Sequence, residues 1–168
     1  MSSKRDEIMD VAEHMIRKHG YNGFSFREIA TSVGVKSASV HYHFATKAEL
    51  GAALARRFRE RFEAELAARA SPDINPLAVW RNLFRDALND DGLMCLCGIL
   101  AVEGDDLPHE VATEARQFMQ SGIDGISKLE GHDAQDGARI MAQLEGAMLL
   151  ARSLGDPKIF DQATQHLA

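Results

Sequence analysis

FREIATSVGVKSASVHYHFA, residues 26–45, is the most informative stretch of the sequence. Its apolar and small residues are spaced as in two short helices joined by a tight turn, which is the helix-turn-helix pattern. Gly34 would supply the left-handed backbone of the turn, where a Cβ costs about 1 kcal/mol or more. Ala30 is small enough for the second helix to cross close by, while Val35 and Val40 fill the space between the helices. A plain helical hairpin with the same turn is the alternative interpretation.

Capping signals flank this stretch on both sides. Ser25 and Glu28 have the spacing of a capping box before the first helix, and Thr46 and Glu49 repeat it before the helix that follows. The polar residues of the second helix fall on one outer face, which suits a helix lying in a major groove about 12 Å wide. Helix N-termini also favour phosphate, and Lys47 adds a positive charge there. The stretch therefore predicts a DNA-binding unit.

Residues from about 5 to 54 resemble the DNA-binding head of the TetR family of repressors. The resemblance is carried by FSFREIATSVGV, by SASVHYHF and by TKAEL, which opens the next helix. The family usually has an aromatic residue in place of His41, and packing beneath the first helix is an alternative role for His43. The resemblance implies base contacts from Lys36, Ser37, Ser39 and His41, and phosphate contacts from Ser25, Arg27, Tyr42, His43 and Lys47.

The whole sequence favours helices, because Ala, Leu, Glu, Arg and Met recur at helical spacing and only four prolines interrupt them. The expected fold class is all-α, with an N-terminal three-helix helix-turn-helix head, a C-terminal helical body and about nine helices. The expected division is a DNA-binding domain over residues 1–48 and an effector-binding and dimerisation domain over 49–168. The expected helices cover residues 4–19, 26–33, 37–44, 47–69, 77–89, 93–103, 108–129, 134–154 and 157–167.

The resemblance implies a homodimer formed by the last two long helices. The sequence of residues 134–154 agrees, because apolar residues occupy two sides of this helix and the chain's own core covers only one. Operator half-sites one DNA turn apart, about 34–36 Å, also require two heads related by a two-fold axis. A fully buried central helix in a monomer is the alternative. The expected interface residues are Met141, Leu144, Ala147, Met148, Ala151 and Phe160.

The resemblance also implies a pocket for a small-molecule effector among the middle helices. The segment LMCLCGILAVEGDDLP, residues 93–108, is similar to a branch of the family that answers to reactive electrophiles or small unsaturated acids. The helical pattern places Cys95 in a first turn, where the helix dipole favours the nucleophilic thiolate. Two buried small hydrophobic residues are the alternative. Candidate lining residues are Phe58, Phe62, Trp80, Phe84, Cys95, Cys97, Phe118, Met119 and Met141.

Composition argues against several other classes of protein. The net charge of −6 divides into +1 for residues 1–50 and −7 for the rest, so only the head suits an anionic partner. No apolar run reaches about 18 residues, as a membrane span requires. Two cysteines spaced two apart indicate a reducing cytoplasm. The sequence has no Gly-rich phosphate loop, HExxH or GxSxG, so we expect no enzyme, no metal site and no cofactor.

These features predict a cytoplasmic transcriptional regulator that binds double-stranded DNA as a homodimer. The simplest form is a repressor that leaves a palindromic operator when an unknown small-molecule effector binds or when a cysteine is modified. The alternative is a helix-turn-helix dimer with no small-molecule effector, which acts constitutively or under the control of a protein partner.

Overall fold

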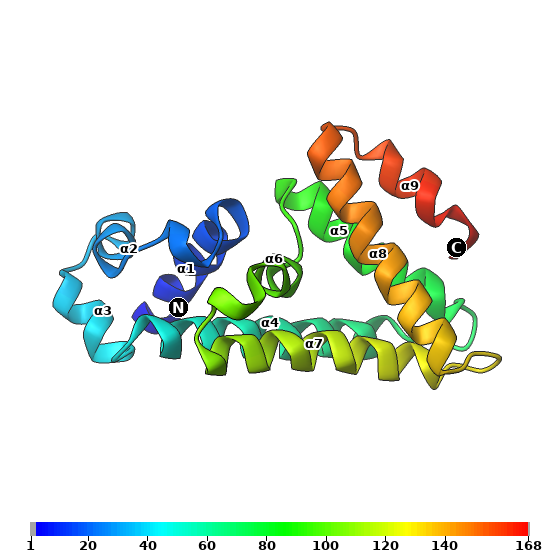
Figure 1. Ribbon diagram of the computed structural model, residues 1–168, viewed down its shortest axis with the longest axis horizontal. Helices are drawn as coiled ribbons and strands as arrows, with labels where there is room; N and C mark the ends of the chain where they lie inside the picture. Colours follow the sequence, from blue (N-terminus) through cyan, green and yellow to red (C-terminus); the bar gives the residue numbers. More distant parts are fainter. Residues whose placement is uncertain (1–2, 168) are drawn as a thin grey trace. The chain divides into compact units, whose positions relative to one another are not determined.

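The computed structural model describes residues 3–167, except for the side chains of Asp90 and Asp91, and is shown in Figure 1. Over this range it has nine α-helices and no β-strand, which confirms the all-α class. The helices are α1 (Lys4–His19), α2 (Phe26–Val33), α3 (Ser37–His43), α4 (Lys47–Arg69), α5 (Pro76–Asp91), α6 (Leu96–Glu103), α7 (His109–Ser127), α8 (Ala134–Leu154) and α9 (Lys158–Thr164).

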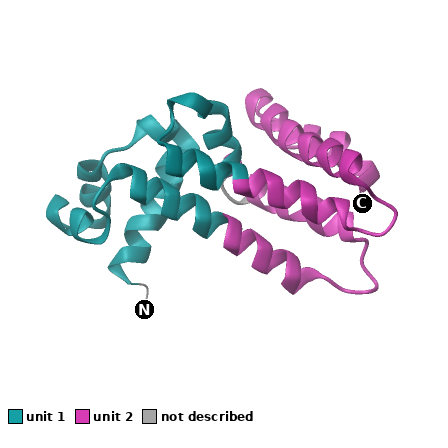
Figure 2. Ribbon diagram, turned by 60° about the horizontal axis from the view of Figure 1, so that its bottom comes forward, with its two compact units in different colours: residues 1–58, 96–116 teal, residues 59–95, 117–168 magenta. Residues whose placement is uncertain are grey.

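The chain forms two compact units, which Figure 2 draws in different colours. Unit 1 comprises residues 1–58 and 96–116, and unit 2 comprises residues 59–95 and 117–168. The divisions fall inside α4 and α7, so each of these helices contributes to both units. Unit 1 therefore joins the three head helices with the first half of α4, with α6 and with the start of α7. The functional division after residue 48 stays a prediction, because packing units and functional domains need not coincide.

The helix ends of the head follow from the capping residues. Ser3 and Asp6 form a capping box at the start of α1. At the start of α2, the Ser25 hydroxyl accepts a hydrogen bond from the backbone N–H of Glu28 at 3.3 Å. The same hydroxyl donates to the Glu28 carboxylate at 2.7 Å. These contacts satisfy donors that the first turn of a helix leaves free, so they fix where each helix begins.

The core of unit 1 is apolar and is bordered by ion pairs. α1 packs against α2, α3 and α6. Arg57 of α4 pairs with Glu13 of α1 at 2.8 Å, and Arg56 pairs with Glu114 of α7 at 2.6 Å. These pairs connect α4 to α1 and to α7 along the edge of the core. The buried side chains include Ile8, Ala12, Ile16, Ile29, Val40, Leu50, Leu54, Leu100 and Val111.

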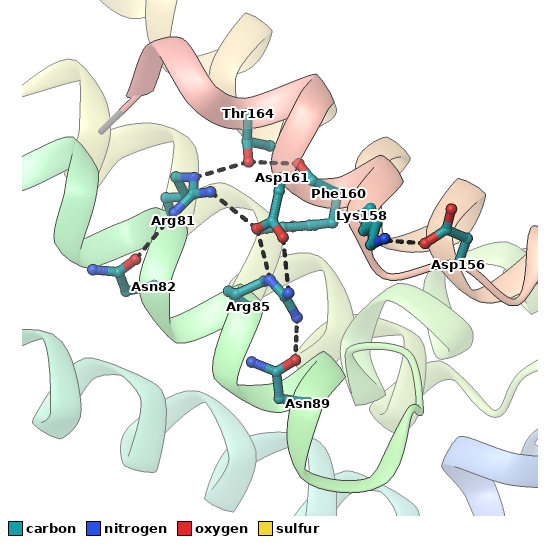
Figure 3. Close-up of polar contacts among 9 residues, drawn as sticks. All are labelled: Arg81, Asn82, Arg85, Asn89, Asp156, Lys158, Phe160, Asp161 and Thr164. Carbon is teal, nitrogen blue, oxygen red and sulfur yellow. Dashed lines mark hydrogen bonds and ion pairs between the residues drawn. The ribbon is translucent and has the colours of Figure 1, made fainter.

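In unit 2, α8 packs against both α5 and α9. Figure 3 shows how α9 is fastened to α5: Arg85 donates to both carboxylate oxygens of Asp161, at 2.7 and 2.8 Å, and Arg81 donates to one of them at 3.0 Å. Arg81 also donates to the Thr164 hydroxyl at 3.0 Å. Because Phe160 is buried beside these groups, α9 is held by both apolar packing and charge.

Four helix starts differ from the sequence prediction: those of α5, α7 and α9 by one residue, and that of α6 by three residues. The helix predicted over 93–103 begins at Leu96, because α5 runs on to a left-handed cap at Gly92 and the three residues between are buried in a non-helical linker. Cys95 therefore precedes the helix, and its predicted place in a first turn is wrong. The last helix begins at Lys158, whose N–H donates to the Asp156 carboxylate at 2.9 Å, so Asp156 still caps this helix end.

Candidate functional site

The turn between α2 and α3 has the geometry that the sequence predicts. Gly34 has φ 73° and ψ 35°, which is the left-handed conformation. The backbone N–H of Val35 donates to the carbonyl of Ala30 at 2.9 Å, and that of Gly34 donates to the carbonyl of Thr31 at 3.3 Å. This hydrogen-bond pattern is that of a Schellman motif, which ends α2 and turns the chain directly into α3. Val40 is buried and anchors α3.

The outer face of the head carries the predicted DNA-contacting residues with different degrees of exposure. Arg27, Lys36 and His41 are exposed, while Ser25, Ser37, Ser39, His43 and Lys47 are half-buried. Tyr42 is 86% exposed. A tyrosine this exposed contributes little to folding, and its ring and hydroxyl are available to a partner.

Besides Lys47, which is described below, four of these residues make contacts within the head: Ser25, His41, Tyr42 and His43. The His41 ring lies edge-on to Phe26 with centroids 4.7 Å apart, and the His43 ring lies 5.2 Å from that of Tyr42. The Ser25 hydroxyl belongs to the cap of α2. The predicted contacts of these side chains with bases and phosphates stay predictions.

Lys47 is more constrained than its sequence position indicates. Its ammonium donates to the carbonyl of Phe24 at 2.8 Å and lies over the rings of Phe24 and Tyr21, at 4.3 and 5.0 Å from their centroids. Partial burial lowers the pKa of Lys47, which the nearby carboxylates of Glu103 and Glu28 partly offset. Lys47 therefore ties the start of α4 to the α1–α2 connection, and only its remaining ammonium protons could reach a phosphate.

Unit 2 contains an apolar cavity of about 570 Å³, a size typical of small-molecule sites. Its wall includes the rings of Phe62, Trp80 and Phe118, with the Phe62 centroid 5.5 Å from Trp80 and 5.4 Å from Phe118. Gly125 leaves room for the Trp80 indole, because a Cβ there would lie 3.0 Å from the ring. The other lining residues are Glu63, Leu66, Ala67, Ala70, Ser71, Ile74, Pro76, Val79, Ser121, Gly122, Asp124, Lys128 and Leu129.

Three of the nine predicted effector residues, Phe62, Trp80 and Phe118, therefore line one cavity. The other six are not among its lining residues: Phe58, Phe84, Cys95, Cys97, Met119 and Met141. The two glycines of α7 in the wall, Gly122 and Gly125, were not predicted, although their spacing of three residues on one helix could have indicated a close approach by another group.

Both thiols are buried. Cys95 is 2% exposed and Cys97 is inaccessible, with its thiol 3.9 Å from the carbonyl of Ala55. The backbone N–H of Cys95 points to the Met148 sulfur at 3.2 Å. Reagents attack an accessible thiolate, so this burial favours the structural role for both cysteines.

The predicted dimer-interface residues need a correction. Met141, Leu144, Ala147, Met148, Ala151 and Phe160 are all buried within the chain, so they cannot form the surface that meets a partner. The sequence shows two apolar sides on α8 but not which one faces the core. The exposed apolar side is the other one, where Leu149, Leu150 and Leu154 are each more than half exposed.

Membrane-spanning helices and clusters of metal ligands are both absent from the described part of residues 3–167. No helix in this range is both long and apolar enough to cross a membrane. Among the side chains that the structure describes in this range, no three of His, Cys, Asp or Glu come together as ligands for a metal ion.

A helix-turn-helix head followed by a larger helical body defines a class of transcriptional regulators. The chain belongs to the TetR family: residues 8–54 match the model of the bacterial regulatory proteins of the tetR family. A TetR-family regulator from Agrobacterium tumefaciens is 30% identical, with a TM-score of 0.89 over 98% of this chain and 95% of that one. A TetR regulator from Legionella pneumophila is 29% identical, with a TM-score of 0.89 over 99% and 96%.

A curated relative is similar over a shorter stretch. The HTH-type transcriptional repressor KstR2 of Mycobacterium tuberculosis is 31% identical over 84 residues, which are 50% of this chain. The match spans only 42% of the length of that relative.

Proposed function

We propose that the protein is a homodimeric transcriptional repressor that binds a palindromic operator through α2 and α3. The observation that carries this proposal is the Gly34 turn, which presents a short helix with an exposed Tyr42 and polar neighbours on its outer face. Membership of the TetR family supports the same function. The cytoplasmic location and the absence of enzymatic activity remain expectations from the sequence.

Replacing Lys36 by alanine tests the DNA interface. Lys36 is exposed at the start of α3, so the substitution should weaken binding to all duplexes. The slope of log affinity against log salt should become shallower by about one unit, because the removed ammonium no longer displaces a counterion from the DNA. Fluorescence anisotropy with a labelled duplex, measured at several salt concentrations, gives this slope. Lys158→Ala on α9 is the matched control, and equal slopes for Lys36→Ala and wild type would remove Lys36 from the interface.

The effector is proposed to be an apolar, ring-bearing small molecule that occupies the cavity beside Trp80. The cavity wall is formed mainly of aromatic and aliphatic side chains, while its charged residues are exposed at the edge. Burial of both thiols favours this form of regulation over cysteine modification.

Trp80 is the only tryptophan of the chain, so its fluorescence reports directly on this cavity. N-phenyl-1-naphthylamine, a neutral aromatic probe, should quench Trp80 on binding. Ala67→Phe should weaken this binding about tenfold or more, because the added ring fills cavity space. Ala68→Phe, one residue further along α4 and not in the lining, should bind as the wild type does. If the probe leaves Trp80 emission unchanged, the alternative without a small-molecule effector is favoured.

A further inference from the structure

Glu103, the last residue of α6, makes a direct contact with the backbone of the DNA-binding head. Its carboxylate accepts a hydrogen bond from the backbone N–H of Tyr21 at 2.7 Å. Tyr21 lies in the connection between α1 and α2, 82 residues away in sequence. All the residues involved belong to unit 1. The end of α6 is therefore bonded to the segment that sets the direction of the helix-turn-helix.

The local backbone is shaped for this contact. Gly20 has φ +79°, a conformation that side-chain-bearing residues rarely adopt, and a Cβ at this position would overlap the Glu103 carboxylate. On the other side of Tyr21, a Cβ at Gly51 of α4 would lie 2.7 Å from the ring. Two glycines thus allow the α1–α2 connection to lie close to both α6 and α4.

The side chain of Tyr21 is also fixed in place by its neighbours. Its ring is buried and lies 5.8 Å, edge-on, from the ring of Phe24. Lys47 covers both rings with its ammonium and bonds the carbonyl of Phe24. Burial, with the charges of Glu110 and Glu103, raises the pKa of Tyr21 to about 12, so the ring stays neutral in this acidic surrounding.

We propose that Glu103 is a positioning residue for sequence-specific DNA binding, which fixes the direction of the helix-turn-helix by anchoring Tyr21 to α6. The proposal rests on the DNA-binding function proposed above. Sequence readout needs base contacts in a set geometry, whereas non-specific affinity follows the charge of the head. Loss of the anchor therefore lowers the ratio of specific to non-specific affinity.

The hydrogen bond and the negative charge of Glu103 can be separated by two conservative variants. Glu103→Gln keeps an oxygen acceptor at the same distance and removes the charge. Glu103→Asp keeps the charge and draws the acceptor back by one methylene. Glu110→Gln on α7 is the matched control for the loss of charge. Glu110 is exposed, and its charge, like that of Glu103, raises the pKa of Tyr21.

The experiment uses the full chain and a duplex that the wild-type protein selects from a random-sequence library, compared with a scrambled duplex. Glu103→Asp should lower the affinity ratio about tenfold, the loss expected for a charge-assisted hydrogen bond. Glu103→Gln and Glu110→Gln should keep the wild-type ratio within about threefold. Hydrogen exchange at the Tyr21 amide should accelerate in Glu103→Asp and not in Glu110→Gln, because only the former withdraws the acceptor.

Each result bears on one proposal. If Glu103→Asp keeps the wild-type ratio of specific to non-specific affinity, the proposed role of Glu103 is wrong. The role is also wrong if Glu103→Gln or Glu110→Gln lowers this ratio as much as Glu103→Asp does. Failure of the wild-type protein to select any sequence overturns the DNA-binding function instead.

Discussion

Glu145→Gln is expected to raise the free energy of unfolding by about 3 kcal/mol at pH 8 and to leave it unchanged near pH 4. Both carboxylate oxygens of Glu145 are buried without a normal hydrogen-bond partner among the described residues. Burial raises the pKa of this carboxyl from 4.5 to about 7, and the weak donor Cys95 offsets only part of the rise.

The sign follows from proton binding. Between pH 4.5 and about 7 the unfolded chain has released the proton that the folded chain still holds. The folded state therefore binds more protons, and the stability of the wild type falls as pH rises through this window. Glutamine does not titrate, so Glu145→Gln should lack this fall.

Urea unfolding followed by Trp80 fluorescence, at one protein concentration and several pH values, measures the difference. The exposed Glu130→Gln serves as the control for removing a carboxylate. A difference between Glu145→Gln and wild type that stays constant from pH 4 to pH 8 would contradict the prediction.

Leu150→Glu combined with Leu154→Glu is expected to give a monomer that binds the selected duplex at least about a hundredfold more weakly than the wild type does. The two side chains are 51% and 66% exposed on one side of α8. A partner subunit is the proposed cover for this side, and carboxylates placed there would be buried without a partner charge. A dimer gains affinity by engaging two half-sites at once, so a monomer loses that gain.

Sedimentation velocity measures the change in oligomeric state, and anisotropy measures the change in affinity. Val102→Glu is the matched control, because Val102 is 81% exposed but lies on α6. A doubly substituted protein that remains dimeric would place the interface elsewhere.

Local signals in the sequence were enough for most of the fold. The range predicted for the first helix agrees with α1, and the left-handed turn at Gly34 is confirmed, because capping and turn chemistry act over three or four residues. The helix predicted from residue 93 was placed too early, because packing of the linker that contains Cys95 outweighs its helical pattern.

The candidate site could be predicted only in part. Periodicity shows that α8 has two apolar sides, but only the fold shows that Met148 faces the core while Leu150 does not. Phe62, Trp80 and Phe118 line one cavity, yet the sequence could not separate them from core residues such as Phe84. The contact between Glu103 and Tyr21 joins residues too distant in sequence for any local pattern to indicate.

The attachment of α9 by Arg81 and Arg85 has a consequence for how this region opens. A seven-residue helix is well below the length at which a helix is stable alone in water. Its backbone order therefore depends on Asp161 and Phe160 remaining docked on the neighbouring helices. Any event that disturbs α5 should therefore release α9 before the rest of unit 2 unfolds. The amide protons of α9 should then be among the first in unit 2 to exchange with solvent.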